Sequence, residues 1–208
     1  HRSMRVCLFY LFASLAIAQT AAQAQKAAQA KALLASERFR EAAVLYGALT
    51  KEISANPGLL LNYGMALHLS GEDAKAIAPL QAALKLNPAI PPALLFLGAS
   101  YLRTGQPAEA LAPLEKLLQL EPQHPEARPM LIDAALSSNQ PARALPHLEK
   151  LTRLEPKRTA LWYELGRTYE TLAADAFAEL EKGHPESGPM FALLAQTRSQ
   201  TSQRKAAF

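Results

Sequence analysis

Apolar residues recur along the chain at a fixed interval of 34 residues. One column of alanines keeps this spacing, and larger apolar residues follow it four positions later. A fixed period of this length indicates stacked units of supersecondary structure, each too small to bury its apolar face alone. The two columns are Ala42, Ala76, Ala110 and Ala144, and Tyr46, Leu80, Leu114 and Leu148.

Glycines and prolines share the same register. The glycines of one column are expected inside helices, and those of a second column are expected in the turns between helices. Asn139 takes the place of glycine at the third position of the turn column. Prolines close successive units, because the residue before a proline is driven out of the helical region. The members are Gly64, Gly98 and Gly166, with Ile132 in the third place; Gly71 and Gly105; and Pro88, Pro122 and Pro156.

Each unit is predicted to be a pair of short amphipathic helices. In residues 91–124, apolar side chains at helical spacing mark the first helix, and Thr104-Gly105-Gln106 breaks it. Pro107 suits the first turn of the second helix, where its missing N–H costs nothing. Gly98 and Ala110 are small enough to let the two helices approach closely. The apolar positions are Leu94, Leu97 and Tyr101, then Leu114 and Leu117.

The pattern changes after Tyr169. No Gly or Asn turn occurs near Ala173, and the apolar stripe runs on without a break. We therefore expect one long helix over about residues 160–182, ended by Gly183 and Pro185. A further helix is expected from about Pro189, similar to the first helix of another unit.

Three prolines lie inside the second helices: Pro79, Pro113 and Pro146. Each removes one backbone hydrogen bond and should bend its helix. Two interpretations stand side by side. The bends tune a superhelical curvature, or they are tolerated in the first half of each helix.

The N-terminal residues have the layout of a secretory signal. Arg5 precedes the uncharged run of residues 6–18, and small residues surround Ala18 and Ala24, the two expected cleavage points. This run is shorter than the roughly 20 residues that span a bilayer, but an uncleaved anchor is the alternative. Residues 1–3 precede the first methionine. The chain is therefore expected to be exported, to the periplasm or beyond.

Removal of the signal changes the charge balance. The whole chain carries a net charge of +4, but loss of Arg2 and Arg5 leaves 20 basic residues against 18 acidic ones. Basic and acidic residues also alternate over residues 149–158, as on a solvated helix face. A nucleic-acid partner and a membrane span after cleavage are therefore not expected.

The residues do not point to catalysis or to a cofactor. The single cysteine, Cys7, lies in the signal, so the mature chain has no thiol for a disulfide, a zinc site or a nucleophile. No histidine pair has metal-ligand spacing, and no phosphate loop or nucleophile elbow occurs. Asp133, Glu164 and Glu170 could be imagined as acid and base, but solenoid helices scatter acids in this way.

The run Trp162-Tyr163-Glu164-Leu165-Gly166-Arg167-Thr168-Tyr169 resembles the first-helix signature of the tetratricopeptide repeat. Ala110, Leu114 and Pro122 resemble its second half, and the resemblance covers about residues 23–170. It implies an all-α fold, a right-handed α-solenoid of antiparallel helix pairs. Residues 1–24 would be the signal, 25–158 four helix pairs, and 159–208 a fifth unit with an extended helix and a truncated further unit.

The resemblance also implies a concave groove lined by first helices, which binds extended or helical partner segments. Its N-terminal half would be apolar, and its C-terminal half would offer charge and hydrogen bonds. The alternative is that the apolar side chains pack against a neighbouring helix or the chain's own terminus. Leu61, Met65 and Leu95 stand where a Lys- and Asn-rich carboxylate clamp would be, so no such clamp is expected. The groove residues are Leu61, Met65, His68, Leu95, Ala99, Leu102, Asp133, Leu136, Tyr163, Arg167 and Glu170.

These features together predict a noncatalytic, exported scaffold or adaptor for a protein or peptide partner, without a cofactor or metal. Its resemblance to signal-bearing, Ala/Pro-rich repeat arrays implies a bacterial source. Two alternatives stay open. The segment is the binding arm of an enzyme whose catalytic domain lies beyond Phe208, or it is an assembly subunit that associates with itself.

Overall fold

The computed structural model describes residues 20–193 and residue 196. The chain divides into two compact units, residues 1–138 and residues 139–208, called unit 1 and unit 2 below. Every regular element in the described residues is helical, which confirms the all-α class predicted from the sequence. The apolar run of the expected signal, residues 6–18, lies outside the described part.

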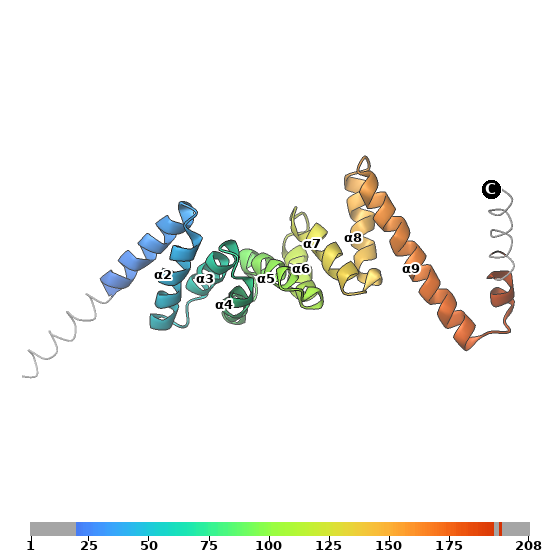
Figure 1. Ribbon diagram of the computed structural model, residues 1–208, viewed down its shortest axis with the longest axis horizontal. Coiled ribbons are helices and arrows are strands. Elements are labelled where there is room, and N and C mark those ends of the chain that lie inside the picture. The colour runs from blue at the N-terminus through green and yellow to red at the C-terminus, as the bar shows by residue number, and fades with distance from the viewer. Residues whose placement is uncertain (1–19, 194–195, 197–208) are drawn as a thin grey trace, which may run out of the picture. The chain divides into compact units, whose positions relative to one another are not determined.

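Unit 1 is a succession of antiparallel helices of 11 to 14 residues, preceded by a helix over residues 20–35. Short turns join them in the order of the chain (Figure 1). The helices are α2 (Phe39–Glu52), α3 (Pro57–Leu69), α4 (Asp73–Leu86), α5 (Pro91–Arg103), α6 (Pro107–Leu120) and α7 (Ala127–Ser137).

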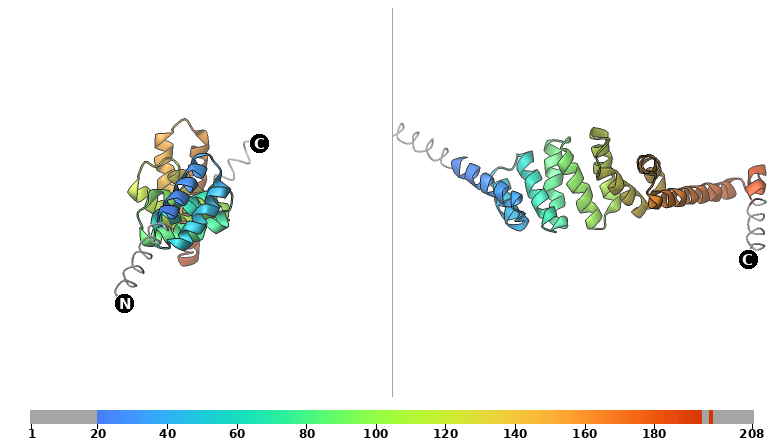
Figure 2. Two further views of the ribbon diagram at one scale, coloured as in Figure 1. Left: turned by 90° about the vertical axis from the view of Figure 1, so that its left-hand side faces the viewer. Right: turned by 90° about the horizontal axis from the view of Figure 1, so that it is seen from above.

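The helices of unit 1 form two layers. Each helix contacts the next one in the chain, and α5 also contacts both α3 and α7. The first helices of successive pairs are therefore close neighbours, as the row of helices in Figure 2 shows. No comparable contact links α4 with α6 in the described residues. The layer of α3, α5 and α7 is thus the more tightly spaced one.

Glycine allows the close crossing within each pair. A Cβ atom on Gly64 would lie 2.5 Å from Cγ of Leu80, and one on Gly98 would lie 2.7 Å from Cγ of Leu114. Both leucines are fully buried. The close approach predicted at Gly98 is confirmed, because any side chain there would displace a core leucine.

A two-residue turn ends each first helix of unit 1. A hydroxyl side chain bonds back to a carbonyl of the last helical turn, and the next residue adopts a positive φ of 54° to 84°. This is a left-handed helix end, which satisfies carbonyls that the helix leaves free. The hydroxyls belong to Ser36, Ser70, Thr104 and Ser138, and the positive-φ residues are Glu37, Gly71, Gly105 and Asn139.

In unit 2, α8 (Pro141–Leu154) pairs with the longer helix α9 (Thr159–Gly183), and residues 188–193 are helical again. Leu172 and Ala173 occupy the places of the hydroxyl and the left-handed residue. Neither side chain supports such a turn, so the helix continues. The long helix predicted at about 160–182 is confirmed, as is its end at Gly183.

The extension of α9 also explains why Gly166 differs from Gly64 and Gly98. A Cβ atom on Gly166 would meet nothing within 4 Å. Its expected neighbour, one unit beyond Leu114 and Leu148, is Lys182, which lies on α9 itself. Without a second helix folded back, there is no leucine to accommodate.

Two side chains in the same repeat position bond to the proline that closes the previous unit. Arg128 donates from Nη2 to the Pro122 carbonyl at 2.6 Å, and Trp162 donates from Nε1 to the Pro156 carbonyl at 3.0 Å. Burial lowers the pKa of Arg128, which is 7% exposed. The weakest copy of the sequence pattern, around Arg128, therefore keeps its helix start by a polar contact.

The three internal prolines do not end their helices. Pro79, Pro113 and Pro146 lie within continuous α4, α6 and α8, and the first two are buried. Each lies near the middle of its 14-residue helix, and Pro146 comes one residue earlier in the 34-residue register than Pro79 and Pro113.

A membrane-spanning helix needs about 20 mostly apolar residues. None of the described helices combines the length and the apolar character needed to cross a bilayer.

The two kinds of glycine lead to opposite predictions. Gly98→Ala should lower the free energy of unfolding by about 1–3 kcal/mol, because the new methyl group must displace Leu114. Gly166→Ala should raise it by about 0.5–1 kcal/mol, because alanine favours a helix and has open space there. Urea denaturation followed by circular dichroism measures both changes. Fluorescence of the single tryptophan, Trp162, reports on unit 2 alone. A loss at both positions would contradict the assigned helix crossings.

Candidate functional site

The first-helix face of unit 1 is the surface that α3, α5 and α7 present away from the second helices. On α3, Leu61, Met65 and Leu69 follow one another at four-residue steps, so they lie along one side of the helix. On α5, Leu95, Ala99 and Arg103 keep the same spacing. Because α3 and α5 are in contact, these rows are neighbours.

The apolar side chains of this face are partly exposed to solvent. Leu61, Met65, Leu95, Ala99 and Leu102 are half-buried. This degree of exposure leaves apolar area available to a partner, which fully buried core residues such as Leu80 do not offer. On α7, Leu136 is half-buried and Asp133 is exposed.

The remaining predicted groove residues lie in unit 2. Tyr163, Arg167 and Glu170 are exposed on α9, and the Arg167 guanidinium stands 6.0 Å from the centre of the Tyr163 ring. Such a cation–π pair at a four-residue step holds both side chains against one flank of the helix. The structure thus groups these three in unit 2 and the other eight predicted residues in unit 1.

His68 differs from the other predicted groove residues because it is 9% exposed. Its Nδ1 atom lies 3.0 Å from Oγ of Ser100 and 2.6 Å from Oδ1 of Asp73. The second Asp73 oxygen lies 3.0 Å from Nε of Arg103, and the Phe96 ring is 5.3 Å from the imidazole. This polar cluster joins α3, the start of α4 and α5.

The cluster does not have the geometry of a catalytic relay. In a nucleophile–base–acid relay the hydroxyl and the carboxylate contact opposite nitrogens of the imidazole. Here Ser100 and Asp73 face the same nitrogen, Nδ1. Its chemistry is therefore that of a buried carboxylate, Asp73, which pairs with the exposed Arg103 side chain and lies beside His68. In the described residues, no group of three or more His, Cys, Asp or Glu side chains could hold a metal ion.

Several residues of the face were missed at the sequence level. Leu69 is 41% exposed and completes the row of Leu61 and Met65, and its four-residue step from Met65 would have revealed it. Arg103 and Ser100 could have been found only through their contacts with Asp73 and His68. Those contacts cross from one repeat to the next, and no local spacing encodes them.

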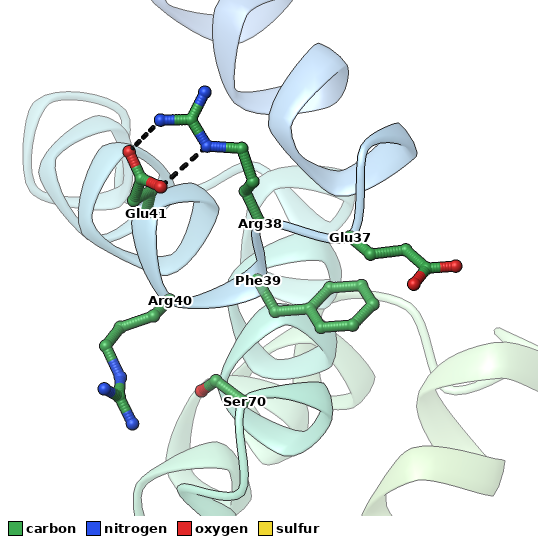
Figure 3. A pocket seen from close by; sticks show the side chains of 6 residues that line it. All are labelled: Glu37, Arg38, Phe39, Arg40, Glu41 and Ser70. Carbon is green, nitrogen blue, oxygen red and sulfur yellow. Dashed lines mark hydrogen bonds and ion pairs between the residues drawn. The ribbon is translucent and has the colours of Figure 1, made fainter.

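Two surface hollows lie elsewhere in unit 1. The first, of about 250 Å³, is shown in Figure 3, where Arg38 turns toward Glu41 while Glu37 and Arg40 point away from each other. Arg38 donates hydrogen bonds from Nε and Nη2 to the two carboxylate oxygens of Glu41, at 2.7 and 2.5 Å. These two charges therefore already pair with each other. The second, of about 500 Å³, is lined by Ala43, Val44, Gly47, Ala48, Lys51, Glu52 and Tyr63. Neither includes a predicted groove residue.

Antiparallel helix pairs with the same turn every 34 residues define a helical-repeat protein. Models of the tetratricopeptide repeat match residues 91–134 in one case and residues 27–91 and 130–188 in another. The chain belongs to the tetratricopeptide repeat family, as its sequence pattern predicted. No curated protein matches the sequence.

Solved structures show the same fold. The MamA protein of Desulfovibrio magneticus RS-1 is 21% identical with a TM-score of 0.61, over 80% of this chain and 97% of that one. YrrB, a TPR protein with an unusual peptide-binding site, is 20% identical with a TM-score of 0.62, over 81% and 88%. The first TPR of Spaghetti, bound to an HSP90 peptide, is 22% identical with a TM-score of 0.53, over 56% and 93%.

The surroundings of His68 predict the direction of its titration. Burial lowers the pKa of His68 below its usual value near 6.5, the Asp73 charge partly opposes this, and Arg103 adds to it. The neutral imidazole is thus favoured by folding. Its contribution to stability is complete above about pH 7.5 and is lost as the pH falls through 6.5 toward the lower folded-state pKa.

Proton NMR titration of the imidazole C–H signals measures this pKa directly. Asp73→Asn should lower the pKa of His68 further, because it removes the one group that favours the charged ring. Glu109→Gln, an exposed change on α6, is the matched control and should leave it unchanged. A pKa above 6.5 in the wild-type protein would contradict the assigned burial.

Proposed function

We propose that the chain is a noncatalytic protein-interaction scaffold that binds a partner segment on the first-helix face of unit 1. The observation that carries this proposal is the row of incompletely buried apolar side chains on α3 and α5. A well-packed monomer buries such rows, and apolar area left beside polar residues is typical of binding surfaces.

The chemistry of the face favours an apolar partner segment. Met65 and the leucines beside it are adaptable, because unbranched or flexible side chains repack around different ligands. Arg103, at the edge, already pairs with Asp73, so little positive charge is left to hold a terminal carboxylate. The partner is therefore an extended or helical segment that inserts apolar side chains between α3 and α5.

Two of the similar structures support a peptide as the ligand. The first TPR of Spaghetti is bound to an HSP90 peptide, and YrrB has an unusual peptide-binding site. In unit 2, exposed Tyr163, Arg167 and Glu170 offer hydrogen-bonding groups to a partner. Self-association is the alternative use of these surfaces.

The proposal includes export of the chain. Arg5 and the apolar run of residues 6–18 support a secretory signal that delivers the repeats to the periplasm or the medium. Mass spectrometry of the protein recovered from the producing cells tests it. A mature N-terminus after Ala18 or Ala24 supports export with cleavage, and an intact residue 4–24 segment on a cytoplasmic product contradicts it.

The binding face is tested with peptides selected from a random 12-residue library against the full chain. Leu95→Asp combined with Leu102→Asp, and Leu69→Asp alone, should each weaken binding of the selected peptides by at least about tenfold. The reason is that each change places a carboxylate where apolar side chains must be buried. Fluorescence polarisation of labelled peptides measures the dissociation constants.

The control is Leu120→Asp, which introduces the same charge at an exposed leucine on the second-helix layer. It should leave binding within about threefold of the wild type, and circular dichroism should show that all variants keep their helices. Peptides that bind the Leu69 and Leu95/Leu102 variants as well as the wild type would place binding elsewhere and contradict the proposal.

A further inference from the structure

Helix α9 is much longer than the helix that covers it. It has 25 residues and α8 has 14, so at 1.5 Å per residue about 16 Å of α9 have no counterpart in α8. The buried side chains of α9 are Leu161, Leu165 and Thr168, all in its first half. Figure 1 shows the second half continuing past the end of α8.

The second half of α9 nevertheless keeps an apolar face. Leu172, Ala173, Ala176, Phe177 and Leu180 follow the spacing i, i+1, i+4, i+5 and i+8, which places them on one side of a helix. Phe177 is 45% exposed, both alanines are exposed, and Leu172 and Leu180 are half-buried. An apolar stripe of this width is the kind that a soluble helix buries against another helix.

Acidic residues border this stripe on both sides. At 100° per residue, Glu170 and Glu181 fall beyond its Phe177 edge, and Asp175 and Glu179 fall beyond its Leu172 edge. Residues 170–183 contain these four carboxylates and one basic residue, Lys182, which leaves a net charge of −3. Lys182 lies 3.9 Å from Glu179. The other three carboxylates have no ion-pair partner in the described residues.

We propose that residues 170–181 of α9 form a second docking surface, which takes a basic amphipathic helix of a partner protein. The apolar stripe requires a partner with a matching stripe, and the two acidic borders require lysine or arginine on its flanks. Charge complementarity of this kind selects partners and speeds their encounter. This surface belongs to unit 2 and is independent of the first-helix face of unit 1.

The other occupants fit this surface less well. Two copies of α9 would bring acidic borders together, and like charges oppose such a pairing. The chain's own residues 197–208 carry Arg198, Arg204 and Lys205. Their apolar residues are confined to the last three positions, so they offer no stripe at helical spacing. The described helical residues 188–193 are apolar and Met190 is buried, but these six residues span about 9 Å, less than the stripe from Leu172 to Leu180.

The test uses a fluorescein-labelled 14-residue peptide of leucine and lysine, patterned as an amphipathic helix, and the full chain. We expect saturable binding by fluorescence anisotropy that weakens as salt is raised. Phe177→Ser combined with Leu180→Ser should weaken binding by about tenfold or more, and Glu170→Gln combined with Glu181→Gln by about threefold to tenfold. A peptide with glutamate in place of every lysine should not bind.

Matched controls separate this surface from general attraction to an acidic protein. Val44→Ser combined with Leu120→Ser removes exposed apolar side chains from unit 1, and Glu109→Gln combined with Glu126→Gln removes the same charge there. Both should leave binding unchanged. Loss in these controls equal to that in the α9 variants would overturn the proposal.

Two further results would also overturn it. The first is binding that appears only after residues 197–208 are removed, which would make the chain's own tail the occupant. The second is a concentration-dependent dimer in sedimentation that Phe177→Ser abolishes, which would make a second copy the occupant. Neither result changes how the Leu69→Asp and Leu95→Asp/Leu102→Asp variants bind the peptides selected from the library, so the two proposals fail separately.

Discussion

The repeated turn at the end of each first helix is the constraint on which unit 1 depends. A hydroxyl such as that of Ser70 caps a carbonyl, and a residue such as Gly71 takes a left-handed conformation, so the chain reverses. Only then can the next helix fold back and place its leucine under the glycine of the first. The buried Leu80 and Leu114, and the layer of α3, α5 and α7, all require that reversal.

The same turn shapes the candidate binding surface. Asp73 lies two residues after Gly71, and its carboxylate reaches both His68 and Arg103. The reversal therefore places a buried negative charge beside two adjacent first helices. In the next two repeats, Leu102 and Leu136 stand where His68 stands here. The polar cluster thus belongs to one repeat junction, and Leu61, Met65, Leu95 and Ala99 beside it are apolar.

The sequence predicts those features of the fold that repeat. Column positions correctly indicated the tight crossing at Gly98, the turns at Gly71, Gly105 and Asn139, and the long helix after Tyr169. These succeed because each depends on steric requirements that a single residue type meets. The turn at Glu37 was missed, because glutamate has no preference for a positive φ and reaches it only through its place in the array.

Contacts between repeats were beyond what spacing could predict. The burial of His68 depends on Ser100 and Phe96, which lie one helix pair further along the chain. The hydrogen bond from Arg128 to the Pro122 carbonyl could not be predicted either. In the sequence, Arg128 only interrupts a column of otherwise apolar residues, and its acceptor is known only from the structure. Such polar substitutions keep a repeat intact while weakening its sequence signature.

The uninterrupted α9 shows how little separates a pair of helices from a single one. Leu172 and Ala173 stand where serine and asparagine stand one repeat earlier. The residues that would have formed a second helix packed against the first instead continue α9. Tandem repeat arrays are often thought to change by gaining or losing whole units. Here the residues at two neighbouring positions lack the turn chemistry of the other repeats, so point substitution at a turn is a route by which a helix pair can become one longer helix.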